Sequence, residues 1–160
     1  MKAAGLVAAE RQDSLLPHAQ VEFQHNSERQ FAKLLDFYAI EWQYEPHTFI
    51  LERSMSGDPV HAFSPDFFLP AYDLHIEITT LRQKLVTKKN RKVRRLQERY
   101  PDVQIKVLYQ RDYLHLLVKY GLESPDQLAG YGPLATAGES PSSLLGLGTF
   151  NRPEGSRGVA

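Results

Sequence analysis

Asp66 and Glu77 are two acidic residues whose spacing predicts that their side chains meet. Strand-like runs on either side of the turn-forming residues 70–73 indicate a β-hairpin with a four-residue loop. Leu69 then faces Leu74, and Asp66 faces Glu77. Opposed side chains have Cβ atoms about 4.5–5.5 Å apart, so the two carboxylates repel unless a cation lies between them. Oxygen ligands at this separation suit a hard ion such as Mg²⁺.

Alternation of side chains along the hairpin supports the same register. A slip of one residue would turn the apolar set away from the core. The less specific reading treats Asp66 as a turn residue after Pro65, and Glu77 as an exposed acid on a half-buried strand. The residues expected on the buried face are Phe67, Leu69, Leu74, Ile76 and Ile78.

A third acid, Glu28, is predicted on the buried face of an amphipathic helix. The helix is expected to begin at Ser27, because residues 27–30 read as a capping box. An alternative role for Glu28 is to complement the helix dipole from the first turn. The apolar stripe has helical spacing and consists of Phe31, Leu34, Leu35 and Tyr38.

A basic helix is predicted from about residue 84 or 87 to Arg99. From Arg82 to Arg99 there are nine Lys or Arg residues and one acid, Glu98. Lys89 shares an inward-facing stripe with Val86, Val93, Leu96 and Tyr100. The other cations form a solvated face, or contact phosphates if nucleic acid binds. The residues expected in such contacts are Arg82, Lys88, Lys92, Arg94 and Arg95.

The remaining periodicity predicts a mixed α/β fold. Residues 41–44 and 48–51 are expected to form a strand pair or one bent strand, and residues 103–109 a strand parallel to the second hairpin strand. A short helix is expected over Asp112–Lys119, with Gly121 as the residue that ends it. Residues 1–20 are expected to be a flexible leader, 21–121 the folded domain, and 122–160 a disordered tail. Residues 121–160 hold eight of the ten glycines and four of the ten prolines, and a weak partner motif lies at 144–147.

Composition excludes several classes of protein. The chain has no cysteine, which rules out disulfides and thiolate metal sites and suggests the cytoplasm. No stretch resembles a membrane span, and the apolar N-terminus is too short for a signal peptide. Net charge is zero, so only the local basic run points to nucleic acid. The oligomeric state is left open, a homodimer being one option.

The order of these features resembles the PD-(D/E)XK nuclease superfamily over residues 23–120. By that resemblance, Glu28 corresponds to the acid of the first helix, Asp66 to the aspartate of the proline-aspartate motif, and Glu77 to the acid of the third motif. The resemblance implies a restriction-endonuclease-like fold, with a mixed central sheet flanked by helices. It also implies Mg²⁺- or Mn²⁺-dependent hydrolysis of phosphodiester bonds, with DNA the expected substrate. Metal ligands would be Asp66, Glu77 and Glu28.

The chain departs from this pattern two residues after Glu77. Thr79 stands where the superfamily usually has lysine. Lys89, on the following helix, is the proposed replacement, since related proteins also relocate this lysine. Its ammonium would orient the attacking water or offset developing charge. The reserve candidates are Lys88, Lys92 and Gln83.

Three functional hypotheses remain at this point. The first is a metal-dependent nuclease with Glu28, Asp66, Glu77 and Lys89 as catalytic residues. The second is a nucleic-acid-binding or regulatory module that keeps the fold without catalysis, and the third is a small interaction domain. The histidines lack metal-ligand spacing, and only His75 shares the face of Asp66 and Glu77.

Overall fold

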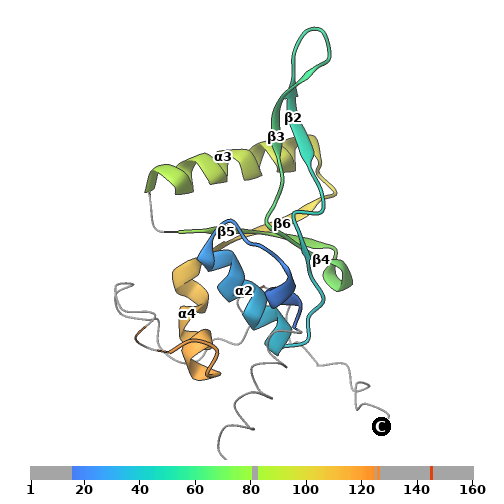
Figure 1. The fold of residues 1–160 in the computed structure, drawn as a ribbon. Helices are drawn as coiled ribbons and strands as arrows, with labels where there is room; N and C mark the ends of the chain where they lie inside the picture. Colours follow the sequence, from blue (N-terminus) through green and yellow to red (C-terminus); the bar gives the residue numbers. More distant parts are fainter. Residues whose placement is uncertain (1–15, 81–82, 125, 127–144, 146–160) are drawn as a thin grey trace, which may run out of the picture.

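A four-stranded mixed sheet lies at the centre of the fold, with helices on both of its faces (Figure 1). The computed structural model describes residues 16–80, 83–124, 126 and 145. In spatial order the strands are β1 (Gln43–Tyr44), β4 (Phe67–Leu69), β5 (Leu74–Thr79) and β6 (Gln104–Tyr109). Strand β4 runs antiparallel to its neighbours β1 and β5, and β6 runs parallel to β5.

The predicted hairpin is confirmed as β4–β5. Leu69 pairs with Leu74 and Phe67 with Ile76, which is the expected register. A short 3-10 helix, η2 (Pro70–Tyr72), forms the loop, and Asp73 closes it with a left-handed φ of 47°. Aspartate tolerates this conformation better than most residues.

One face of the sheet carries the main core beneath helices α2 (Asn26–Phe37) and α4 (Gln110–Lys119). All five apolar residues predicted for the inner face of the hairpin are buried there, together with Phe31, Leu34 and Leu35 of α2. The expected capping box at residues 27–30 is wrong. The helix is instead preceded by His25 as its N-cap, and the His25 N–H donates to Glu28 Oε2 at 2.6 Å.

The opposite face is covered by helix α3 (Gln83–Arg99), the predicted basic helix. Val93 and Leu96 are buried in a second core, and Tyr100 packs against it, so the inward stripe is confirmed. The chain leaves β5, crosses over through α3 and returns as β6, beside and parallel to β5 as expected.

A two-stranded antiparallel ribbon stands apart from the central sheet (Figure 1). It consists of β2 (Phe49–Arg53) and β3 (Pro59–Phe63). The expectation that residues 41–51 form a pair or one bent strand is therefore wrong. β1 joins the central sheet, and β2 pairs with a strand that follows it.

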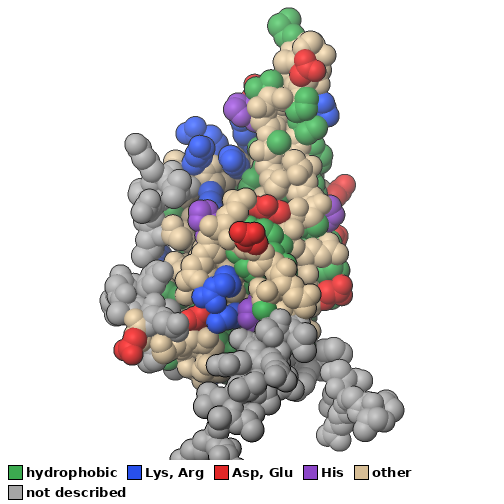
Figure 2. Space-filling view, viewed as in Figure 1, with side chains coloured by type: hydrophobic (Ala, Val, Ile, Leu, Met, Phe, Trp, Pro, Cys, Tyr) green, Lys and Arg blue, Asp and Glu red, His purple; other side chains and the backbone are tan. Residues whose placement is uncertain are grey.

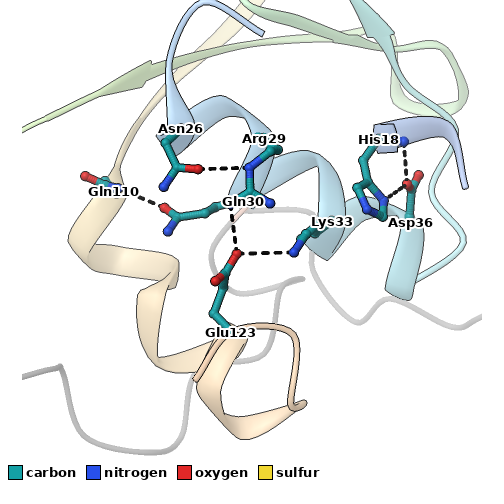
Figure 3. A network of polar contacts seen from close by, with 8 residues as sticks. All are labelled: His18, Asn26, Arg29, Gln30, Lys33, Asp36, Gln110 and Glu123. Carbon is teal, nitrogen blue, oxygen red and sulfur yellow. Dashed lines mark hydrogen bonds and ion pairs between the residues drawn. The ribbon is translucent and has the colours of Figure 1, made fainter. Parts of the chain in front are cut away.

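Both expected boundaries of the folded domain need correction. The 3-10 helix η1 (Pro17–Gln20) packs on α2, and both its His18 backbone N–H and its His18 ring nitrogen lie 2.8 Å from Asp36 Oδ2 (Figure 3). After α4, Glu123 forms ion pairs with Arg29 and Lys33 at 3.2 and 3.3 Å. Leu145 is 4% exposed and belongs to the main core. The other residues of the predicted leader and tail, apart from those named as described, lie outside the described part.

Among the described residues, no helix combines the length and apolar character needed to cross a lipid bilayer.

Candidate metal centre

Asp66 and Glu77 lie side by side on the face of the sheet that α3 covers. The hairpin brings them there, and both are buried, at 6% and 4% exposure. The Asp66 backbone N–H donates to Glu77 Oε2 at 3.2 Å, and the Ile78 N–H donates to Asp66 Oδ2 at 2.8 Å. These backbone bonds fix both carboxylates without consuming all their lone pairs, so each keeps the capacity to accept a further ligand.

Lys89 supplies the positively charged side chain that the hairpin itself lacks. Its Nζ lies 3.1 Å from Glu77 Oε1 and also donates to the carbonyl oxygen of Ile78. The 3–4 spacing of the inward stripe on α3 directs this side chain toward the sheet. Thr79, on the same strand face as Glu77, is buried and carries no charge, so the ammonium comes from the helix.

Glu28 reaches the same region from the first turn of α2. It is 2% exposed, and its Oε1 accepts a hydrogen bond of 3.3 Å from the Tyr44 hydroxyl. Its other oxygen caps the helix through the His25 N–H. Glu28 therefore both closes the N-terminus of its helix and presents a carboxylate to the site.

Glu45 is an acid of this site that the sequence reasoning missed. One oxygen each of Glu28, Glu45 and Asp66 lie within 4.8 Å of one another. Glu45 adopts a left-handed φ of 45°, unusual for a residue of its type, and its N–H donates to the Asp66 carbonyl at 2.9 Å. Strain of this kind clusters at functional sites. In the sequence, Glu45 is an acid between a predicted strand and a proline, and this pattern is too common to identify a site residue.

Glu77 does not belong to the trio of close carboxylates. Its two oxygens face Lys89 and the Asp66 N–H instead. The structure thus brings all four predicted catalytic residues, Glu28, Asp66, Glu77 and Lys89, into one region, and adds Glu45. Within the region, Glu28, Glu45 and Asp66 are spaced to share a metal, and Glu77 bridges them to the lysine.

Burial raises the pKa of the two central carboxyls, Asp66 and Glu77. It raises the pKa of Asp66 to about 7, a rise to which Glu28 adds and which a backbone hydrogen bond and Lys89 oppose. Burial, followed by the Asp66 charge, raises the pKa of Glu77 to about 7, and Lys89 again opposes the rise. A divalent cation would supply the charge that favours the ionised forms.

Three of the residues predicted to contact phosphates are exposed on α3. Lys88, Arg94 and Arg95 are exposed, whereas Lys92 is half-buried, with its Nζ 5.9 Å from the centre of the Phe63 ring. Arg95 also lies 3.6 Å from Glu52 of the ribbon. Lys and Arg side chains gather over α3 in Figure 2. Arg82 lies outside the described residues.

His75 is packed inside the fold. It is buried between the rings of Phe49 and Phe68, and its Nε2 lies 3.0 Å from Nδ1 of His47. Burial lowers the pKa of His75, so the neutral ring is favoured. These contacts explain His75 as a packed residue of the fold.

Comparison of the chain with protein-family models, with curated proteins and with solved structures gave no match. The fold and site on their own define a mixed α/β protein with a buried, lysine-paired cluster of carboxylates.

Proposed function

We propose that this protein is a metal-dependent phosphodiesterase, an endonuclease-like hydrolase acting on DNA with Mg²⁺ or Mn²⁺. The observation that carries the proposal is the contact of Lys89 with Glu77, 3.1 Å between Nζ and Oε1, beside a trio of close carboxylates. A restriction-endonuclease-like arrangement of the sheet and helices belongs to the same proposal, as does a cytoplasmic location.

The donor set fits a hard divalent cation. Carboxylate oxygens are the ligands that Mg²⁺ and Mn²⁺ prefer, and the described site offers neither thiolate nor an imidazole of suitable position. Asp66, Glu28 and Glu45 would hold the ion, and Glu77 would contribute an oxygen or orient Lys89. An ion held by these residues would supply Lewis acidity, which lowers the pKa of a bound water and offsets negative charge that develops on a phosphate.

Lys89 would act on the reacting groups without a metal bond. Its ammonium donates three hydrogen bonds, of which Glu77 and the Ile78 carbonyl take two. The third donor is available to hold the attacking water or a phosphate oxygen. Placed there, it offsets charge that develops in the transition state.

The non-catalytic alternative also has an observation in its favour. Lys89 already has two acceptors, and Thr79 leaves the strand without a charge of its own. A protein with these features could bind nucleic acid and leave it intact. The choice between the two functions depends on whether bonds are broken.

Cleavage assays on labelled duplex DNA, single-stranded DNA and RNA with Mg²⁺ or Mn²⁺ test the proposal. We expect the wild type to cut DNA, Asp66→Asn to be inactive, and Lys89→Met to lose on the order of 10²–10³ in rate. The double variant Thr79→Lys/Lys89→Met should recover part of the activity, since it returns the ammonium to the face of Glu77. A wild type that cuts none of the substrates would favour the non-catalytic alternative.

A further inference from the structure

The β2–β3 ribbon projects well beyond the helix on which its base rests (Figure 1). Leu51 and Phe63 anchor it in the second core with Val93 and Leu96 of α3. The Tyr100 hydroxyl adds a hydrogen bond of 3.0 Å to the Ile50 carbonyl. Beyond Leu51, the strand residues Glu52 and Arg53 span about 7 Å, and the turn at residues 54–58 extends the ribbon further. The ribbon is therefore a projection with a firmly packed base.

Bulges shape the outer half of the ribbon. Ile50 pairs with Ala62 and Glu52 with His61, so Leu51 is an extra residue that turns into the core. Between Glu52 and Arg53 the register shifts again, which leaves Val60 as the extra residue, 52% exposed. Bulges of this kind increase the twist and aim the outer half away from the sheet.

The tip is held in one shape by its own hydrogen bonds. The Ser54 N–H donates to the Asp58 carbonyl at 2.8 Å, and the Gly57 N–H donates to the Ser54 carbonyl at 2.9 Å. The Arg53 guanidinium donates to the Gly57 carbonyl at 2.9 Å, and the Ser56 hydroxyl to Asp58 Oδ2 at 3.0 Å. Gly57 supplies the φ of 89° that this turn needs. The tip is thus preorganised, which lowers the cost of binding.

Met55 stands at this tip with its side chain fully in solvent, at 108% relative exposure. None of the tip's hydrogen bonds involves its side chain, so a rigid frame presents one large apolar group. Beside the ribbon's base, Lys88, Arg91, Arg94 and Arg99 are exposed on α3, and Figure 2 shows Lys and Arg side chains gathered there. An apolar wedge next to a cationic helix complements a duplex, whose backbone is anionic and whose base steps are apolar.

We propose that α3 and the ribbon form a duplex-DNA-binding surface in which Met55 enters the minor groove and wedges between two base pairs. The reach of the ribbon exceeds the depth of that groove, about 7.5 Å. The cations of α3 then lie along the adjacent phosphates, and the wedge bends the duplex. This inference rests on the proposed function only for the choice of DNA as the partner.

The test measures binding of the wild type to a labelled duplex of about 30 base pairs in EDTA, where no metal-dependent cleavage occurs. We expect Met55→Ala to weaken binding about five- to tenfold, the scale for losing one contact to the base stack. Met55→Leu should retain it, since leucine also serves as a wedge. Leu16→Ala, at another exposed apolar residue, is the matched control and should leave affinity unchanged. Fluorescence of 2-aminopurine in the duplex should rise with the wild type and stay flat with Met55→Ala.

Several results would overturn the inference. Equal affinity and equal 2-aminopurine signal for wild type and Met55→Ala would do so, as would a wild type that binds no duplex, or that binds anionic vesicles in preference to it. The fate of the proposed function is read separately, from cleavage of the same duplex after Mg²⁺ is added. If the protein cleaves DNA but Met55→Ala changes neither binding nor cleavage, only the wedge proposal is refuted. If binding depends on Met55 but no cleavage occurs, only the nuclease proposal is refuted.

Discussion

Replacing Lys89 with methionine should destabilise the protein by an amount that grows with pH. Methionine keeps much of the buried stem and removes the ammonium, which contacts Glu77 and the Ile78 carbonyl. The lost hydrogen bond to the carbonyl costs about 1 kcal/mol at any pH. The lost ion pair matters only where Glu77 is ionised, so its cost depends on the pKa of that carboxyl.

The size of the pH-dependent part follows from the pKa of Glu77. In the wild type this pKa is about 7, raised by burial and opposed by Lys89, and without Lys89 it rises further. Both proteins lose stability as pH rises above the pKa of Glu77 in the unfolded chain, because Glu77 keeps its proton in the folded state and has released it in the unfolded state. The wild type stops losing stability near pH 7, whereas the variant continues at about 1.4 kcal/mol per pH unit. The difference in free energy of unfolding should be about 1 kcal/mol at pH 6 and about 2–3 kcal/mol at pH 8.

Urea denaturation at pH 6 and pH 8, at equal ionic strength and followed by the fluorescence of Trp42, measures this difference. Lys88→Met is the matched control, because Lys88 is its exposed neighbour on α3 and should change stability by less than about 0.5 kcal/mol at both pH values. A loss for Lys89→Met that is the same at pH 6 and pH 8 would show that Lys89 is not paired with Glu77 in solution.

Three further outcomes are expected. Glu45→Gln should weaken Mn²⁺ binding at least roughly tenfold in calorimetry, and Glu41→Gln is the control that should leave it unchanged. The affinity of the wild type for Mn²⁺ should rise from pH 6 to pH 8, because the buried carboxyls must lose protons before they bind the ion. Equal affinity at the two pH values would contradict the site. Leu145→Ala should lower the free energy of unfolding by about 2–4 kcal/mol in urea, and a loss below about 0.5 kcal/mol would place the leucine outside the core. Arg94→Ala should reduce the slope of log affinity for duplex DNA against log salt by about 0.9, whatever the sequence, and an unchanged slope would remove this arginine from the phosphate contacts.

Local periodicity explains why the hairpin and Lys89 were predictable. Alternation along 66–78 has one register that buries Phe67, Leu69, Leu74, Ile76 and Ile78 together, so the pairing of Asp66 with Glu77 follows from a period of two. The inward direction of Lys89 follows in the same way from helical spacing. Each prediction needed only residues close together in the chain.

Apart from the misplaced capping box at the start of α2, the errors involve contacts between distant segments. Glu45 reaches Asp66 only because its backbone takes a left-handed turn after β1, and nothing in its neighbours requires that turn. Leu145 enters a core built from residues 31–117, and its segment looked too polar to fold. The separate ribbon depends on bulges that only the pairing of β2 with β3 reveals. Composition and periodicity carry no information on such long-range contacts.

The raised pKa values of Asp66 and Glu77 explain how the protein can stay folded around the acidic cluster when no cation is bound. Four carboxylates in one region would repel strongly if all were ionised, but Asp66 and Glu77 hold protons up to about pH 7. Glu28 is stabilised differently, by the His25 N–H and the Tyr44 hydroxyl. A cation held by Glu28, Glu45 and Asp66 near neutral pH therefore has to displace the proton of Asp66, while Glu28 keeps its donors. Metal binding and proton release should consequently be coupled at Asp66, and at Glu77 where it contributes an oxygen, whereas the N-terminus of α2 should stay capped in both states.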